Sequence, residues 1–302
     1  MTILSPIMSY IVDKEVGFPI PSEKEKINKV LRRYRYILTK SQRRGDVPEI
    51  MFGIADLLVG RNESGDYVQA KIIYDEILLR HVPESLRGRA LIGKSELMIG
   101  EPKEFDNAIL LCEKARKILG KDMSDFFSAK TYVVEAELLL ARHKNGDWLE
   151  AKKLNNKVIK ERSAQWYFKG RALLCNAEIS LYQKPKDLKT PLKLTDAALK
   201  QFKNRPDDYF ACKGNVLKSE ILIRRTRKGD IEKAEKLLTE VVKMSLPYTE
   251  LIARAKLNLA DIANNPKAAK LLKQVNQMEG LDPYLAEKAR LIEEALKEKR
   301  KR

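Results

Sequence analysis

Apolar and small residues recur along the chain at helical offsets and within a long period. A phrase of a small residue, an acid and Leu or Ile occurs six times, with its acids 40 to 42 residues apart. The copies are Ala55-Asp56-Leu57, Ser95-Glu96-Leu97, Ala136-Glu137-Leu138, Ala177-Glu178-Ile179, Ser219-Glu220-Ile221 and Ala260-Asp261-Ile262. So regular a spacing predicts an array of stacked supersecondary units.

The residues around each phrase follow a helical pattern. Eight residues before the acid stands a small residue in five copies: Gly88, Ala129, Gly170, Cys212 and Ala253. Four residues before it stands an apolar residue in all six: Phe52, Ile92, Val133, Leu174, Val216 and Leu257. Offsets of four and eight return to the same side of a helix. Each copy therefore predicts one helix, the A helix of its unit.

A polar break and a second helical pattern follow the A helix. In three copies the break is Gly-Asp, at Gly65-Asp66, Gly146-Asp147 and Gly229-Asp230. Glycine suits the end of the A helix, and we expect the aspartate to cap the amides of the next helix. An alanine recurs four residues later or at a comparable place: Ala70, Ala108, Ala151, Ala234 and Ala268. Each unit is thus an A helix, a turn and a B helix.

The second halves of three units carry a family resemblance. The stretches GDYVQAKIIYDEIL, GDWLEAKKLNNKVI and GDIEKAEKLLTEVV resemble the second half of a tetratricopeptide repeat (TPR). The small residue of each phrase and the B-helix alanines match the small positions of that family, over roughly residues 47 to 279. The resemblance implies a right-handed α-solenoid that binds other proteins.

Two features depart from the usual TPR pattern. The period of about 41 residues exceeds the family's ~34 and is similar to the longer variant in kinesin light chains and maltose-regulator-type proteins. In the fourth copy, Pro191 stands where the B-helix alanine belongs. Because proline lacks an amide hydrogen, we expect this helix to start late or to kink.

The expected fold is all-α: six helix-turn-helix repeats over 47–279, with capping helices at 22–44 and 282–302, in one domain spanning 22–302. The A helices are expected near 47–61, 84–99, 124–144, 164–182, 207–228 and 248–263. The B helices are expected near 66–80, 104–119, 147–161, 188–203, 230–244 and 266–278. The C-terminal cap would place Leu285, Ala289, Ile292 and Leu296 on one face.

Residues 1–21 predict an extended arm. They contain three prolines and several apolar residues without a helical period, namely Ile3, Leu4, Ile7, Met8, Tyr10, Ile11, Val12, Phe18 and Ile20. The arm either covers apolar surface of the first units or reaches a partner or a second copy of the chain. We favour the first interpretation.

The predicted helix 22–44 has two different faces. Ser22 and Glu25 form a capping box at its start. One stripe, of Ile27, Val30, Leu31, Tyr34 and Leu38, suits packing on the first repeat. The opposite stripe consists of Lys29, Arg33, Tyr36, Lys40 and Arg44. It is either a solvated face or a surface for phosphates, with Tyr36 stacking on an unpaired base.

The A helices also carry two rows of charge. Seven residues before the repeat acid stands a base in five copies, Arg89, Lys130, Arg171, Lys213 and Arg254, whereas the first copy has Glu49. Seven residues are two turns, about 10.5 Å. With Glu96, Glu137, Glu178 and Glu220, these bases either line a charged groove for a peptide or pair between repeats. Because the rows balance in charge, we favour inter-repeat pairing.

Composition limits the classes of function. The 302 residues carry a net charge of +17, which favours anionic partners such as nucleic acid, acidic protein or an anionic membrane surface. Cys112, Cys175 and Cys212 suit buried free thiols in a reducing compartment. No apolar run reaches the ~20 residues of a membrane span, and the N-terminal residues do not resemble a secretory signal. The cytoplasm is the expected location.

Signals for catalysis are poor. His81 and His143, the two histidines, lie near predicted helix ends, where they suit capping, and phosphate-loop, metal-ligand and nucleophile motifs are missing. We therefore expect no enzyme activity, cofactor or metal.

Three functions remain open at this point. The leading one is a scaffold that binds a peptide or protein, expected to be acidic, in a groove lined by the A helices. The alternative is binding of RNA or single-stranded DNA through helix 22–44 and neighbouring basic residues, including Arg224, Arg225, Arg227 and Lys228. A third is an accessory subunit that holds a catalytic partner. The sequence defines neither the partner nor the oligomeric state.

Overall fold

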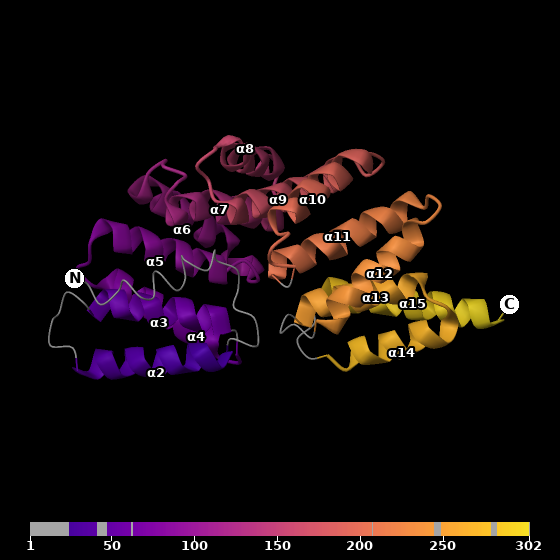
Figure 1. The fold of residues 1–302 in the computed structure, drawn as a ribbon, viewed down its shortest axis with the longest axis horizontal. Helices are drawn as coiled ribbons and strands as arrows, with labels where there is room; N and C mark the ends of the chain where they lie inside the picture. Colours follow the sequence, from indigo (N-terminus) through magenta and orange to yellow (C-terminus); the bar gives the residue numbers. More distant parts are fainter. Residues whose placement is uncertain are drawn as a thin grey trace. The chain divides into compact units, whose positions relative to one another are not determined.

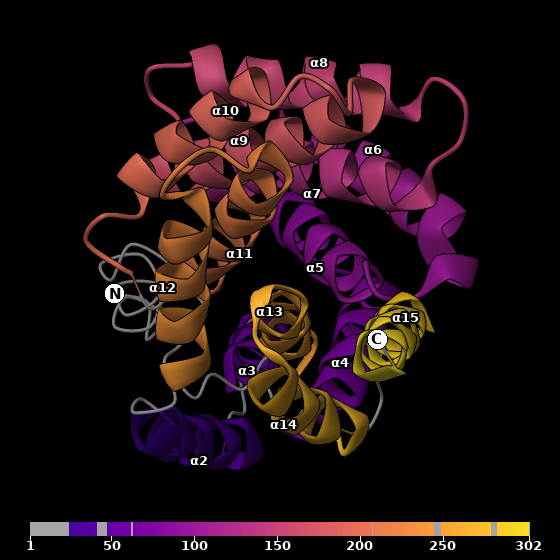
Figure 2. The same ribbon diagram turned by 90° about the vertical axis from the view of Figure 1, so that its right-hand side faces the viewer.

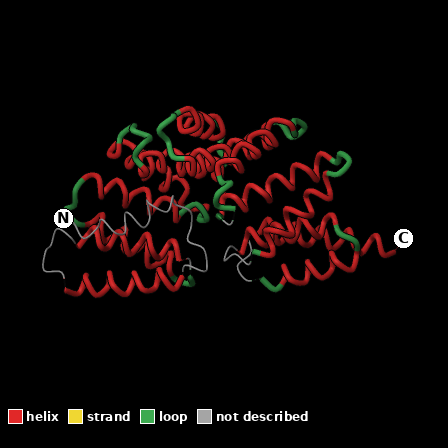
Figure 3. The backbone as a smooth tube through the Cα atoms, in the orientation of Figure 1, coloured by secondary structure: helices red, strands yellow, loops and turns green. Residues whose placement is uncertain are grey.

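The computed structural model describes residues 24–40, 47–61, 63–206, 208–244, 249–278 and 283–301. Throughout these ranges the regular secondary structure is helical (Figures 1 and 3). The A helices are α3 (Val47–Arg61), α5 (Glu84–Leu97), α7 (Phe126–Arg142), α9 (Trp166–Gln183), α11 (Tyr209–Arg225) and α13 (Thr249–Ile262). The B helices are α4 (Asp66–Leu79), α6 (Phe105–Leu119), α8 (Asp147–Lys160), α10 (Lys189–Gln201), α12 (Asp230–Lys243) and α14 (Asn265–Asn276). Helix α2 (Lys24–Lys40) precedes them, α15 (Pro283–Lys301) follows them, and the short η2 (Pro102–Glu104) leads into α6.

All twelve repeat helices lie where the sequence predicted them, with ends that agree to within three residues. The predicted all-α solenoid is therefore confirmed. Because each A helix is followed directly by its B helix, the alternation of small, apolar and acidic positions was enough to define the helix pairs.

The helices form two compact units, residues 1–179 and 180–302, which are described separately. In the first unit, each helix from α3 to α7 packs on the helix that follows it, and α5 also contacts α7. In the second unit, successive helices from α10 to α14 pack in the same way, and α11 contacts α13. Figure 2 shows α13, α14 and α15 side by side. Contacts between neighbours in sequence are typical of a repeat array.

Small residues allow the helices to approach one another closely. The small residue of each phrase is buried, from Ala55 in the first repeat to Ala260 in the sixth. At Gly93 in α5, a Cβ atom would lie 2.6 Å from the ring of Tyr74 in α4. A Cβ atom so close could be accommodated only if neighbouring atoms moved. The Tyr74 ring therefore occupies the space that a side chain at position 93 would need.

The terminal helices cap the array as predicted. Ile27, Leu31 and Tyr34 of α2 are buried, and α2 packs on α3. Burial raises the pKa of Tyr34 to about 12. The apolar face of α15, which is Leu285, Ala289, Ile292 and Leu296, joins the core of α13 and α14. The expected arm 1–21, the capping-box Ser22 and the basic Arg44 lie outside the described residues.

The aspartate of the Gly-Asp break does not cap the B helix, which corrects the prediction. Gly146 is itself the N-cap of α8, with φ of 87°, and Asp147 is the first helical residue. The Asp147 carboxylate accepts hydrogen bonds from Arg142 Nε at 2.9 Å, Arg142 Nη2 at 2.6 Å and the Lys144 amide at 2.8 Å. A two-pronged guanidinium contact is stronger than a neutral cap.

The same arginine-aspartate clasp closes two other turns. Arg61 binds Asp66 between α3 and α4, with a shortest distance of 2.5 Å. Arg225 binds Asp230 between α11 and α12, with a shortest distance of 2.7 Å. In all three turns the arginine stands five residues before the aspartate and ends the A helix. The clasp therefore fixes the angle at which each B helix leaves its A helix.

The B helix of the fourth repeat starts late, as Pro191 predicted. In repeats with the Gly-Asp break, the B helix begins four residues before its alanine, whereas α10 begins at Lys189, two residues before Pro191. Proline is tolerated there because the amides of the first turn have no helical acceptor. Asp187 accepts hydrogen bonds from the amides of Lys189 and Thr190, each at 3.1 Å.

Replacing Asp147 by alanine should destabilise the chain by about 2 kcal/mol, because the substitution removes the buried acceptor of Arg142 and of the Lys144 amide. The measurement is the free energy of unfolding in urea. Asp106→Ala is the matched control, since Asp106 also contacts Arg142, at 2.6 Å, but its side chain is 66% exposed. The control should change stability far less, because solvent screens an exposed ion pair. Equal losses in the two variants would contradict the structural role of the clasp.

Candidate functional site

The charged rows of the A helices pair between repeats in the first unit. Lys130 Nζ lies 2.6 Å from Glu96 Oε2, so the base of the third repeat meets the acid of the second. Arg171 Nη2 lies 2.6 Å from Glu137 Oε2, and Arg171 Nη1 lies 2.9 Å from Glu96 Oε1. The predicted inter-repeat pairing is confirmed for these residues. Arg171 also reaches one repeat further than expected.

Burial and charge together tune this cluster. Burial by itself raises the pKa of Glu96, but Lys130 and Arg171 outweigh it and lower the pKa to about 2. Burial disfavours the charged form of Arg171, yet Glu137 and Glu96 raise its pKa well above the usual value. Glu96 and Arg171 are therefore both ionised at neutral pH. The Arg171 side chain is 2% exposed, so its charge is directed at the two glutamates.

We call the series of ion pairs between the A helices of successive repeats the ladder. Its first pair differs from the others. Arg89 Nη1 lies 3.1 Å from Glu49 Oε2, and the guanidinium stands over the rings of Phe52 and Phe127, at 4.3 and 4.9 Å from their centroids. Glu49 stands at the position that holds a base in the other repeats. The acid of the first phrase, Asp56, accepts a hydrogen bond from the hydroxyl of Tyr74 at 2.6 Å. Burial raises the pKa of Asp56.

The ladder of the second unit extends onto the C-terminal cap. Arg254 binds Glu220 through Nε and Nη2, at 2.7 and 2.5 Å. Asn258 Nδ2 donates to Glu220 Oε1 at 2.9 Å, and Lys288 Nζ of α15 donates to Asn258 Oδ1 at 2.6 Å. Burial lowers the pKa of Lys288. The remaining candidates, Glu178 and Lys213, are partly buried.

Four bases of the ladder are paired with acids that also lie on A helices. Each of Arg89, Lys130, Arg171 and Arg254 has a carboxylate within 3.1 Å. A base held this way has little charge left for a second anion. If a partner binds along the A helices, it meets a surface of balanced charge.

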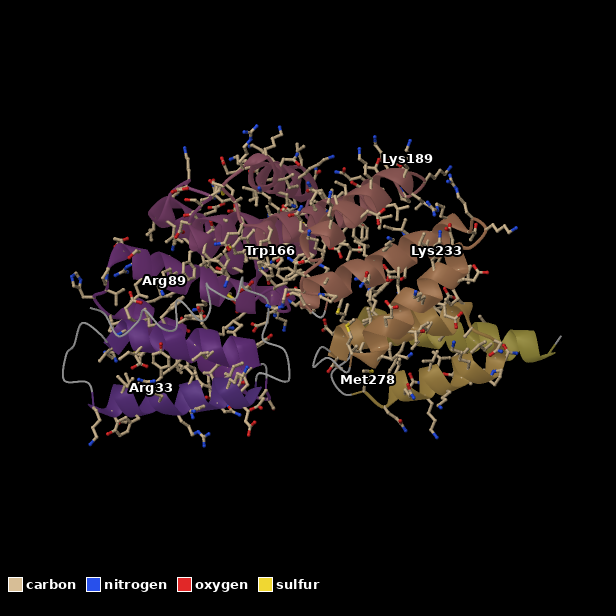
Figure 4. The ribbon with its side chains drawn as sticks, in the orientation of Figure 1. Arg33, Arg89, Trp166, Lys189, Lys233 and Met278 are labelled. Atoms are coloured by element: carbon tan, nitrogen blue, oxygen red, sulfur yellow. The ribbon has the colours of Figure 1, made fainter. Side chains whose placement is uncertain are left out.

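The basic stripe of α2 is arranged differently. Lys29, Arg33 and Lys40 are exposed, and Tyr36 is 64% exposed. Arg33 is labelled on α2 in Figure 4. Within the described part of the chain, none of the three cations has a carboxylate partner, in contrast to the ladder. The predicted outward stripe is thus present from Lys29 to Lys40.

His143 and the three thiols occupy structural positions. His143 ends α7 with a positive φ of 57°, and its ring lies edge-on to Trp148 at 5.4 Å. Cys112, Cys175 and Cys212 are buried free thiols, as expected. Over the described ranges, no three side chains of the metal-binding types are grouped. The helices of these ranges include none that is long and apolar enough to cross a membrane.

Sequence reasoning missed two sets of paired charges. The first is the arginine-aspartate clasp, whose signal was available as an arginine five residues before each Gly-Asp aspartate. The second is the pair of Arg116 and the buried Glu135, with Arg116 Nε 3.0 Å from Glu135 Oε2. Glu135 lies beside the repeat phrase but not in it, so no periodic signal marked it.

Comparison with known proteins defines the class of fold. No protein-family model and no curated protein sequence matches the chain. Among solved structures, the chain is similar to the signal transduction ATPase with numerous domains (STAND) protein with a tetratricopeptide repeat sensor from Pyrococcus horikoshii. The TM-score is 0.54 at 16% identity, over 89% of this chain and 45% of that one. The chain thus spans less than half the length of that protein. The likeness shows a TPR-like helical-repeat fold.

Replacing Arg171 by methionine should destabilise the chain by about 3 kcal/mol, because the buried Glu96 and Glu137 lose a shared counter-charge. Urea unfolding measures the loss. Adding Glu137→Gln should recover part of it, since one uncompensated charge is then removed. Arg290→Met is the control, because Arg290 pairs with Glu287 and Glu294 on the surface of α15 at 55% exposure. If Arg171→Met were as mild as the control, the ladder would not stabilise the fold.

Proposed function

We propose that the chain is a non-enzymatic scaffold that binds a peptide or protein along its A helices. The observation that carries the proposal is the repeat architecture itself: helix pairs whose side chains are occupied in packing and in pairing with one another. Proteins built this way use an extended surface for binding. The 41-residue period supports a long-repeat variant similar to those of kinesin light chains and maltose-regulator-type proteins.

The net charge of +17 supports an acidic partner. Because the ladder bases are paired with acids, the attraction must come from cations outside the ladder. Examples are the exposed Lys152, Lys157 and Lys160 of α8. These lysines raise the association rate with an acidic protein. The A-helix surface, whose charges balance, instead discriminates between partners by their shape. The three buried thiols support a reducing compartment such as the cytoplasm.

Binding along the A helices predicts that neutralising a ladder pair weakens partner capture. In Glu220→Gln with Arg254→Gln, both charges go together, so neither is left buried alone and the fold should persist. The control is Glu235→Gln with Lys267→Gln, a paired acid and base on the B helices α12 and α14. Pull-down with tagged full-length protein should lose at least about tenfold of the captured partner in the first variant only.

The same pull-down distinguishes protein partners from nucleic acid. A partner captured by the scaffold should remain after nuclease treatment. Loss of the partner on nuclease treatment, or equal capture by the two neutralised variants, would contradict binding along the A helices. A co-purifying enzyme would identify the chain as an accessory subunit.

A second candidate function is binding of RNA or single-stranded DNA through α2. It is supported by exposed cations that have no carboxylate partner among the described residues, spaced four and seven residues apart on one side of the helix. Phosphates neutralised by such cations release counterions, and Tyr36 offers a ring for stacking. An anionic membrane is disfavoured because the apolar stripe of α2 packs on α3 and cannot insert. In the second basic segment, Arg225 binds Asp230 and is not available to phosphates.

Arg33→Glu with Lys40→Glu should abolish binding of a labelled RNA or single-stranded DNA oligonucleotide, because two phosphate contacts become repulsive. Fluorescence anisotropy across a salt series measures the affinity and its salt dependence. Lys152→Glu with Lys160→Glu, on exposed positions of α8, makes the same change in net charge and should retain most of the binding. Equal effects of the two variants would show that only the overall charge matters.

A further inference from the structure

Helix α4 presents an apolar face that nothing in the described residues covers. Val68, Ile72 and Leu79 are 63%, 60% and 88% exposed. Their spacings of four and seven residues place them on one side of the helix. Tyr67, at 41% exposure, stands at the start of the same helix. The face is a strip that runs nearly the full length of α4.

The charged residues of α4 do not shield this strip. Lys71 pairs with Glu101 at 3.0 Å, and Asp75 pairs with Lys94 of α5. Glu76 pairs with Arg80 just beyond the end of the helix. By contrast, α8, the B helix of the third repeat, exposes Lys152, Lys153, Lys157 and Lys160. The exposed side of α8 thus carries four lysines and one leucine, Leu149, whereas that of α4 carries Val, Ile and Leu.

The chain enters α2 beside the start of this strip. Arg61, the last residue of α3, donates a hydrogen bond to Asn28 in the second turn of α2 at 2.8 Å. The same arginine clasps Asp66, the first residue of α4. The first turn of α2 therefore lies next to the turn from which α4 begins. The start of α2 therefore lies close to Tyr67 and Val68, at the start of the strip.

We propose that the outer face of α4 is the docking surface for the apolar segment that precedes α2 in the same chain. That segment carries Ile3, Ile7 and Ile11 among its apolar residues. The strip from Val68 to Leu79 is about 17 Å long, a length that five or six extended residues cover. Twenty-three residues precede α2, so the segment has length to spare. Docking gives the segment an apolar partner and removes an exposed strip from water.

An introduced thiol tests the proposal on the full chain. Cys112, Cys175 and Cys212 are buried, so they give a low background with a thiol reagent. Ile72→Cys should be modified at least about tenfold more slowly than Leu149→Cys, the matched control on α8, because docking shields α4 alone. Leu149 is 73% exposed, close to the 60% of Ile72, so the two thiols should react alike if α4 is uncovered.

A second pair of variants identifies what covers the strip. Ile7→Asp with Ile11→Asp, added to Ile72→Cys, should raise its modification rate to that of Leu149→Cys, and should leave Leu149→Cys unchanged. Equal rates for Ile72→Cys and Leu149→Cys with the natural segment would overturn the proposal. Protection that persists in the aspartate variants would overturn it as well. If that protection falls on dilution, the strip is covered by a second copy of the chain.

Discussion

The structure depends on how closely consecutive helices approach one another. Where α4 meets α5, the ring of Tyr74 occupies the volume of the side chain that Gly93 lacks. The charged side chains of adjacent A helices can then meet, because their limited length allows ion pairs only between helices that lie close together. The ladder, the turn clasps and the burial of the phrase residues all follow from this close packing.

Close packing also explains why the ladder carries charge at all. Burying two opposite charges gains little over packing apolar residues, because desolvation offsets most of the attraction. An apolar pair, however, can slide along the helix, whereas Arg171 binds Glu137 with two defined hydrogen bonds. Charged pairs therefore fix the register between repeats at modest gain in stability. The aromatic rings beside Arg89 act in the same direction, since its guanidinium lies over the rings of both Phe52 and Phe127.

Most of the fold could be predicted from the sequence because it is built from local, periodic units. The small residue, the acid and the apolar residue of each phrase gave the A helices, and Pro191 gave the late start of α10. The pairing of Lys130 with Glu96 followed from the repeat spacing. The role of Asp147 was predicted wrongly, because an aspartate after glycine suits a helix cap equally well in sequence. The arginine five residues before the aspartate is the sequence feature that distinguishes the two roles, and the structure shows Arg142 bound to Asp147. The second partner of Arg171 was not predictable, since Lys130 and Arg171 stand at equivalent positions.

The reach of Arg171 has a consequence for the evolution of such an array. Repeat proteins usually gain or lose whole units, because each unit interacts only with its neighbours. The clasp of Arg142 and Asp147 is compatible with the gain or loss of whole units, because both residues lie within six residues of one repeat and are duplicated or deleted together. Arg171 instead joins the fourth repeat to both the second and the third. Deleting the third unit would remove one carboxylate of a buried triad, and inserting a unit would move another out of range. The second, third and fourth repeats are therefore expected to be inherited together.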